Sequence, residues 1–289
     1  MLLRFFLTLF LGAMVVGPLL FLVLGKWVVF HKLMNRALLV CALAAMASTW
    51  SRLRLHEWWP WDRRAIGQVL LGLFIAFISV QTIVGVDVGF GGLAWAGITA
   101  SKCAQLVATA VIAAILVPLT EETIFRGFLQ TEFSRRIGAL GGWLLAALVF
   151  ALSHFLKVPA SFDHIPVHWW SGVPAVGAAV KFMCSGGIFS GQGLNYFLIG
   201  LILGGIFWRT GMLWLNYGLH AGWILGLQLA SGLTHPAPVR SIWIGGDLLS
   251  SPLTSLVMVL LGFWLWLFFR RPPPEPESPP PSAPGAMTR

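Results

Sequence analysis

Residues 118–127 of this 289-residue chain read PLTEETIFRG and continue an apolar run from Leu106 to Leu119. The run is long enough to be buried in a membrane, and two adjacent carboxylates, Glu121 and Glu122, follow it directly. A charge at bilayer depth costs about 2.5–3.5 kcal/mol on insertion scales, so charged residues there face a protein interior or a water-filled cavity. We therefore interpret Glu121 and Glu122 as the functional site around which the chain is organised.

The composition predicts an all-α, polytopic membrane protein. Hydrophobic residues make up 57% of the chain and charged residues 10%, whereas soluble domains carry about 25% charged residues. The formal net charge of +9 is spread over short loops, which favours contact with anionic lipid headgroups and argues against nucleic-acid binding. We expect about eight transmembrane helices around an intramembrane polar cavity, with membrane lipids as partners.

Eight apolar stretches are close to the roughly 20 residues that a spanning helix needs. They lie at about 5–25, 34–50, 66–86, 104–134, 139–156, 193–208, 211–232 and 252–269. The predicted organisation begins with N-terminal transmembrane helices at 1–100, which include an interfacial segment at 51–64. A catalytic core at 101–233, a C-terminal transmembrane helix at 234–271 and a disordered Pro-rich tail at 272–289 follow. Residues 157–192 predict a partly ordered extracytoplasmic loop.

Loop charges predict an orientation with both termini in the cytoplasm. The Arg-rich loops fall on one side of the membrane, as in Arg135 with Arg136 and Arg270 with Arg271, and such loops are typically cytoplasmic. One loop, which contains Lys26 and Lys32, disagrees with this orientation.

Polar side chains from three predicted spans fall at a similar depth. At 1.5 Å per residue, Glu121, His154 and His220 lie roughly 16–24 Å above the cytoplasmic ends of their spans. One shared polar cavity is the economical explanation. Glu122 and Arg126 are four residues apart and share a helix face, which suits an ion pair, whereas Glu121 is rotated from Glu122 by about 100°.

These residue types suit hydrolysis of an amide bond inside the membrane. A carboxylate in a cavity is a plausible general base for water. A neighbouring histidine can position the water or stabilise the developing oxyanion. We expect Glu121 to be the base, Glu122 and Arg126 to support it, and His154 and His220 to bind the water or the oxyanion.

Three motifs in this order resemble those of the CPBP family of intramembrane proteases, which includes type II CAAX prenyl endopeptidases and bacterial Abi, or bacteriocin-immunity, proteins. They are EExxxR at Glu121–Arg126, FxxxH at Phe150–His154, and His220. The resemblance implies an eight-helix membrane fold and a glutamate-dependent endopeptidase acting on a membrane-proximal peptide. By analogy, we expect a bacterial inner-membrane protein whose substrate is a peptide signal or sorting tail.

The third motif departs from the family pattern, which usually reads HxxxN or HxxxD. Here Ile224 occupies the last position, and Asn195 or Asn216 is a candidate substitute for the missing polar partner. This departure motivates a second reading, in which the chain is a non-catalytic immunity or scaffold protein of the same fold.

Two further alternatives concern metal and transport. We expect no obligatory cofactor. If a metal is bound, zinc held by Glu121, His154 and His220 suits these donors. A proton-coupled transporter would use intramembrane Glu and His as a relay, but the two similar halves typical of transporters are not apparent in the sequence.

Overall fold

The computed structural model describes residues 1–47, 55–61 and 63–268. Within this part, the predicted spans are helical except at their ends, and two short strands are added. The α-helices are α1 (Leu2–Leu24), α2 (Phe30–Ala47), α3 (Leu55–Trp58), α4 (Arg63–Gly89), α5 (Ala100–Glu122), α6 (Thr131–Ser153), α7 (Gly172–Met183), α8 (Gly191–Thr210), α9 (Trp214–Leu233) and α10 (Pro252–Phe268). The strands are β1 (Leu93–Trp95) and β2 (Thr234–Pro236).

The helices confirm the predicted fold class. In the described residues, six helical segments are long and apolar enough to cross a membrane: α1, α2, α4, α8, the joined segment Ala100–Ser153 and the segment Gly172–Phe189. The helix α10 is apolar but shorter, and α9 carries the polar residues Asn216, His220 and Gln228. The chain is therefore an all-α polytopic membrane protein.

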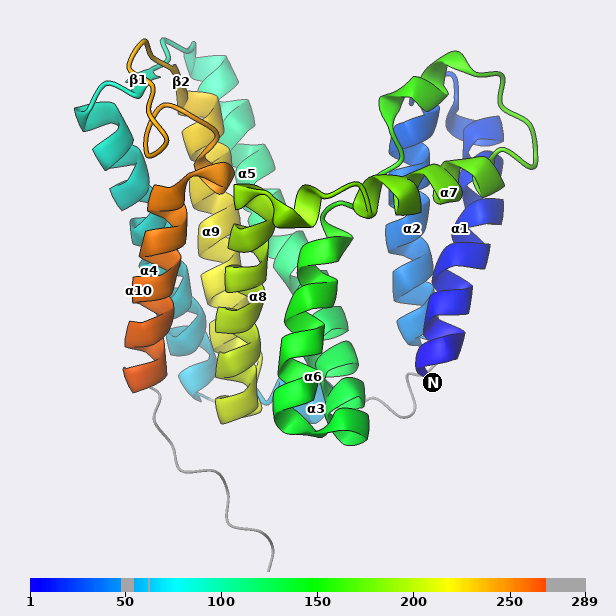
Figure 1. The fold of residues 1–289 in the computed structure, drawn as a ribbon, viewed down its shortest axis with the longest axis horizontal. Coiled ribbons are helices and arrows are strands. Elements are labelled where there is room, and N and C mark those ends of the chain that lie inside the picture. Colours follow the sequence, from blue (N-terminus) through cyan, green and yellow to red (C-terminus); the bar gives the residue numbers. More distant parts are fainter. Residues whose placement is uncertain (48–54, 62, 269–289) are drawn as a thin grey trace, which may run out of the picture.

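The helices form two groups joined by α6 and α7 (Figure 1). In the larger group α9 packs against both α4 and α5, and α8 packs against both α6 and α10. The hairpin of α1 and α2 stands apart, and α7 crosses beside it (Figure 1). The beginning of α1 and the end of α10 lie on the same side of the molecule (Figure 1).

The site hairpin is built from α5, a π-helical segment and α6. The π segment, Thr123–Gln130, follows Glu122 without a break, and all eight of its residues are buried. The chain reverses at Gly138, which has φ of 79°, a value that glycine adopts without strain. This turn separates the two predicted spans 104–134 and 139–156.

Close packing of α9 on α4 depends on glycine. A Cβ atom on Gly218 would lie 2.2 Å from the carbonyl oxygen of Val69, so any side chain there would push the helices apart. Small residues allow backbones in a membrane to approach in this way. The contact fixes the position of α9, which carries Asn216 and His220 into the centre of the larger group.

The stretch between α6 and α8 is more ordered than the sequence predicted. The predicted loop 157–192 contains the helix α7, because its apolar face packs on α1. Asp163 accepts hydrogen bonds from the amide of His31, at 2.9 Å, and pairs with Nδ1 of the same residue at 2.5 Å. Burial alone would raise the pKa of Asp163, but the two bonds from His31 lower it, so this anchor is lost only as pH falls through the lowered pKa.

One short two-stranded sheet is added to the predicted all-α fold. β1 and β2 pair antiparallel, with Leu93 opposite Pro236, and join the loop before α5 to the loop after α9. Three residues in each strand are too few to give an alternating pattern that a sequence reading detects.

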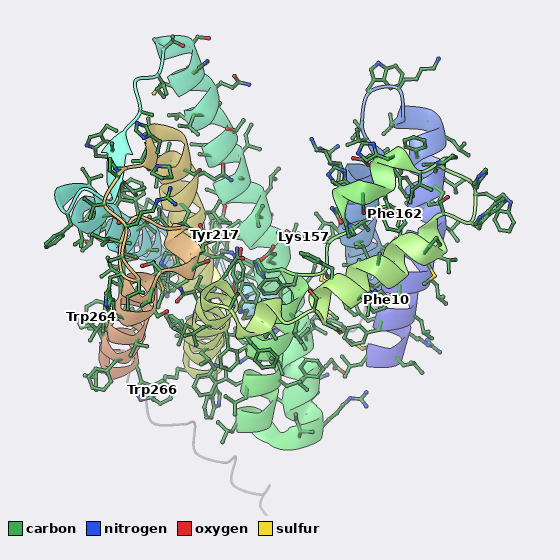
Figure 2. The ribbon with its side chains drawn as sticks, turned by 45° about the horizontal axis from the view of Figure 1, so that its top comes forward. Phe10, Lys157, Phe162, Tyr217, Trp264 and Trp266 are labelled. Atoms are coloured by element: carbon green, nitrogen blue, oxygen red, sulfur yellow. The ribbon has the colours of Figure 1, made fainter. Side chains whose placement is uncertain are left out.

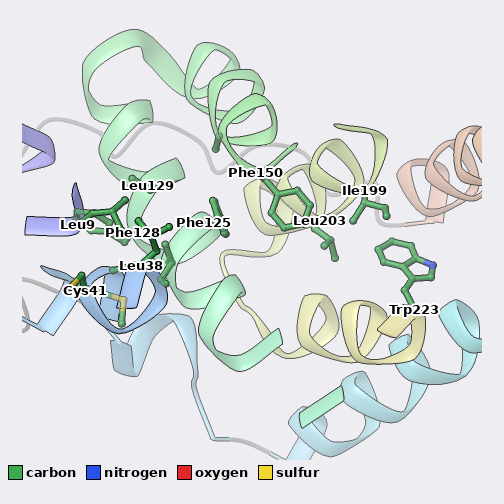
Figure 3. Packing of buried hydrophobic residues seen from close by; sticks show 14 of the residues in the cluster. Leu9, Leu38, Cys41, Phe125, Phe128, Leu129, Phe150, Ile199, Leu203 and Trp223 are labelled. Carbon is green, nitrogen blue, oxygen red and sulfur yellow. The ribbon is translucent and has the colours of Figure 1, made fainter. Parts of the chain in front are cut away.

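The apolar core is continuous across the two groups of helices. Leu9 and Leu38 of the α1–α2 hairpin face Phe128 and Leu129 of the π segment (Figure 3). On the other side of the π segment, the core continues to Phe150, Leu203, Ile199 and Trp223 (Figure 3). The π segment is therefore enclosed on both sides, which explains why all of its residues are buried.

A group of tryptophans lies near the end of α10, where the ring of Trp143 contacts those of Trp208 and Trp266. Trp264 and Trp266 lie toward the end of α10 (Figure 2), and the guanidinium carbon of Arg209 lies 3.3 Å from the ring centroid of Trp266. Only part of the predicted interfacial segment 51–64 is described, including Trp58, which is buried against Gly127. The predicted disordered tail at 272–289 lies outside the described residues.

Candidate active site

Glu122 is a fully buried carboxylate with several hydrogen-bond partners. It is 0% exposed and receives three side chains. Its Oε1 atom lies 3.0 Å from Nη1 of Arg126 and 2.7 Å from Nδ1 of His220. Its Oε2 atom accepts a hydrogen bond of 3.3 Å from the amide of Asn216. A buried carboxylate is tolerated only with such compensation, so Glu122 ties the site hairpin to α9.

Arg126 reaches Glu122 from the next turn of the site hairpin. Its guanidinium carbon also lies 4.3 Å from the ring centroid of Phe150 in α6, a distance suited to a cation–π contact. The side chain of Arg126 is 2% exposed. It lies between the carboxylate of Glu122 and the ring of Phe150. The predicted ion pair between Glu122 and Arg126 is present in the structure.

The side chain of Glu121 points away from the hydrogen-bond partners of Glu122. The side chain is 23% exposed, and its Oε2 atom has no hydrogen-bond partner among the described residues. That atom lies 3.8 Å from Nε2 of His220, which is longer than a direct hydrogen bond. Consecutive residues of a helix point about 100° apart. This rotation lets one glutamate serve the network while its neighbour faces a cavity.

The two histidines have the same hydrogen-bonding pattern. Nδ1 of His220 faces the carboxylate of Glu122, and Nδ1 of His154 lies 2.9 Å from the carbonyl oxygen of Phe150. Both partners are acceptors, so each Nδ1 atom carries a proton. Nε2 is then the nitrogen left for chemistry on each ring.

A cavity of about 310 Å³ brings the predicted site residues together. Its wall includes Glu121 from α5, His154 from the end of α6 and His220 from α9. These three residues come from the three spans that the depth estimate placed in one layer. Glu122 and Arg126 lie behind the cavity, where they hold its wall.

A second, apolar cavity of about 440 Å³ lies between the α1–α2 hairpin and the site hairpin. Leu9, Leu38, Phe125 and Leu129 contribute to its wall, and they appear together in Figure 3. Glu121 alone, among the described residues, lines both cavities. The carboxylate therefore lies where an apolar space meets a polar one.

Ile224 lies on the wall of the polar cavity, where the usual third motif has a polar side chain. Of the two candidate substitutes, Asn216 reaches the site and donates to Glu122. Asn195 does not: it donates to the carbonyl of Leu249 and accepts from Ser255, so it joins α8 to the region around α10.

Sequence reasoning missed Tyr196, which lines the polar cavity and stacks on His154. One signal was available, since the chain has two tyrosines and this one follows Asn195 inside an apolar span. Gln228 of α9 is a further polar residue of this wall, two turns beyond His220.

A metal ion held by Glu121, His154 and His220 would use Nε2 of each ring, because Nδ1 of His220 is engaged by Glu122 and Nδ1 of His154 by a backbone carbonyl. In the part of the chain that the structure describes, no three His, Cys, Asp or Glu side chains are grouped to hold a metal ion. We derive no catalytic step through a metal.

Replacing Glu122 with Gln keeps the shape of the side chain but removes the charge that compensates Arg126. We expect the free energy of unfolding to fall by about 3–5 kcal/mol, because a buried charge is left without its partner. Glu121→Gln is the matched control and should change it by less than about 1 kcal/mol. Unfolding of the purified variants in mixed micelles measures both values, and equal stability of the two variants would contradict this assignment.

Comparison with known proteins agrees with the motifs. A family model described as Type II CAAX prenyl endopeptidase Rce1-like matches residues 103–226. The matched residues run from the first turn of α5 into α9 and include Glu121, His154 and His220. No curated protein and no solved structure matches the chain. Residues 103–226 are thus an Rce1-like region, which confirms the resemblance to CAAX-type intramembrane proteases that the three motifs predict.

Proposed function

We propose that this protein is an intramembrane endopeptidase that hydrolyses a peptide bond with water activated by Glu121. One observation carries the proposal: the side chain of Glu121 is 23% exposed and lines the polar cavity, while Glu122 is 0% exposed and is bonded by three side chains. Only Glu121 is thus in a position to exchange a proton with a water molecule in the cavity.

The chemistry follows from Nε2 of His220, which lies 3.8 Å from Oε2 of Glu121, and from His154 on the same cavity wall. Water bound to the Glu121 carboxylate on its cavity side would lose a proton to the carboxylate as the water oxygen attacks the scissile carbonyl carbon. His154 lines the same cavity and, when its Nε2 is protonated, would stabilise the oxyanion. The proton then passes from Glu121 to the leaving amine, and the products are a carboxylic acid and an amine.

Glu122 and Arg126 act through other residues in this scheme. The carboxylate of Glu122 holds His220 at Nδ1, which directs Nε2 toward Glu121. A carboxylate that orients an imidazole in this way favours one tautomer and stabilises its protonated form. Arg126 keeps Glu122 charged and fixed.

The apolar cavity supports a substrate with an apolar segment. It has about 440 Å³ of space and shares Glu121 with the polar cavity. A membrane-embedded end of a peptide would bury its apolar groups there and extend its scissile bond toward Glu121. The matching family model carries CAAX prenyl endopeptidase in its description; we favour a peptide signal or sorting tail over a prenylated substrate.

The proposed location is the bacterial inner membrane, with both termini in the cytoplasm. The two ends of the described chain lie on the same side of the molecule (Figure 1), which supports an even number of crossings. The turn within α6 and the end of α8 lie on that side as well (Figure 1), and Arg135 and Arg209 are close to them in the sequence, as expected for cytoplasmic loops.

A non-catalytic immunity or scaffold role is the second candidate, and Ile224 is the observation that favours it. An apolar side chain stands on the cavity wall where the family pattern has Asn or Asp. In that case the Glu122 network would be purely structural, and no cleavage would depend on Glu121.

Glu121→Gln tests the proposal. The variant keeps the size of the side chain and loses the basic oxygen, so we expect cleavage to fall by about 100-fold or more. Membrane proteomes of cells that express the native chain or the variant are compared for a peptide whose cleavage needs the native chain. That peptide then serves as the substrate for the purified proteins.

Glu132→Gln is the matched control for a carboxylate on the same hairpin. Glu132 is paired with Arg135 and does not line either cavity, so this variant should retain wild-type cleavage. Identical peptide sets from the native chain and the folded Glu121→Gln variant would overturn the protease proposal in favour of a scaffold.

Leu39→Trp tests the substrate cavity without touching the proposed catalytic groups. Leu39 lines the apolar cavity and is 46% exposed, so a larger ring enters the cavity without disturbing the core. We expect kcat/KM to fall roughly 10-fold or more, since apolar pockets discriminate on this scale. Val40, which is 51% exposed and lies outside the cavity wall, provides the control Val40→Trp. Equal kcat/KM for the two variants would place substrate binding elsewhere.

A further inference from the structure

His154 is a half-buried residue at the very end of a helix, where the backbone holds a side chain less firmly than in the middle of the helix. It is the C-terminal cap of α6, and the chain leaves the helix after it. One hydrogen bond, from Nδ1 to the carbonyl oxygen of Phe150, fixes one atom of the ring. A single bond of this kind leaves the imidazole able to pivot, so a second contact is needed to fix its plane.

Tyr196 provides that second contact from a different helix. Its ring stacks on the imidazole of His154, with centroids 3.9 Å apart and planes inclined by 25°. The ring of Phe150 meets the same imidazole edge-on, with centroids 4.7 Å apart. His154 is thus held between one ring from α6 and one from α8, while both His154 and Tyr196 line the polar cavity.

We infer that Tyr196 is a positioning residue that fixes the imidazole of His154 through the face of its ring. The inference rests on the proposed peptidase function for its catalytic meaning. With Nδ1 tied to a carbonyl and the ring plane set by Tyr196, Nε2 of His154 has one direction left, toward the cavity. Preorganised groups of this kind contribute to catalysis because they need no rearrangement during the reaction.

The hydroxyl of Tyr196 is a secondary feature. It accepts a hydrogen bond from Gln192, one turn earlier in α8, at the long distance of 3.4 Å. Removing the hydroxyl leaves the ring and its stacking in place. The ring and the hydroxyl therefore make different predictions for two substitutions at the same position.

The kinetic test compares Tyr196→Phe with Tyr196→Leu. A group displaced by about 1 Å can cost up to about 100-fold in rate, so we expect Tyr196→Leu to lower kcat about 10-fold or more, with KM within about twofold of wild type. Tyr196→Phe should restore kcat to within about twofold. In a His154→Ala background, Tyr196→Leu should cause no further loss, because its effect passes through the imidazole.

Tyr217→Leu is the matched control for the loss of a tyrosine. Tyr217 lies in α9, donates to the carbonyl of Ile115 and does not line the polar cavity, so kcat should stay at the wild-type value. A wild-type kcat for Tyr196→Leu would overturn the inference. A Tyr196→Phe variant as slow as Tyr196→Leu would overturn it too, because the role would then belong to the hydroxyl.

A labelling measurement tests whether Tyr196 holds the imidazole of His154, and it does not need a cleavage assay. Diethyl pyrocarbonate modifies imidazole nitrogens, and peptide mass spectrometry reports the rate at His154. We expect Tyr196→Leu to raise that rate several-fold and Tyr196→Phe to leave it unchanged; equal rates in all three proteins would overturn the inference. If cleavage by the native chain proved independent of Glu121, the proposed function would fail while the labelling result still decided whether Tyr196 holds His154.

Discussion

The buried carboxylate of Glu122 is the constraint on which the rest of the structure depends. A charge with no exposure inside a membrane protein is stable only with close partners. Those partners come from one turn further along the site hairpin, at Arg126, and from α9, at Asn216 and His220. The network therefore sets how far α9 can slide or turn against α5. Glycine contacts such as that of Gly218 with α4 hold α9 from its other side.

Two adjacent glutamates acquire different properties from this single constraint. Both oxygens of Glu122 are bonded to Arg126, Asn216 or His220. The neighbouring Glu121 is therefore turned toward the two cavities, and one of its oxygens has no hydrogen-bond partner among the described residues. The same network directs Nε2 of His220 toward Glu121. Structure and chemistry are thus coupled: the interaction that stabilises the hairpin also prepares the groups proposed to activate water.

Much of the fold was predictable because its causes are local. Apolar stretches of spanning length identify the helices, and the four-residue spacing of Glu122 and Arg126 predicts their ion pair. Counting residues from the helix ends placed Glu121, His154 and His220 at one depth, and all three line one cavity.

Features that depend on packing between distant segments were not predictable. The helix α7 lies in a stretch expected to be a loop, and it is held by contacts with α1 that its own sequence does not reveal. The stacking of Tyr196 on His154 joins two helices whose relative rotation is set by tertiary packing. Nor did periodicity decide which glutamate faces the cavity, because that depends on where Asn216 and His220 arrive from α9.

Carbodiimide labelling tests the division between the two glutamates most directly. Dicyclohexylcarbodiimide partitions into membranes and reacts with carboxyl groups that can take up a proton, and peptide mass spectrometry distinguishes modification at Glu121 from modification at Glu122. Because Glu122 is 0% exposed and bonded by three side chains, whereas Glu121 faces the cavities, the folded protein should be labelled at Glu121 and spared at Glu122. Labelling of Glu122 to the same extent as Glu121, or more, would contradict the account.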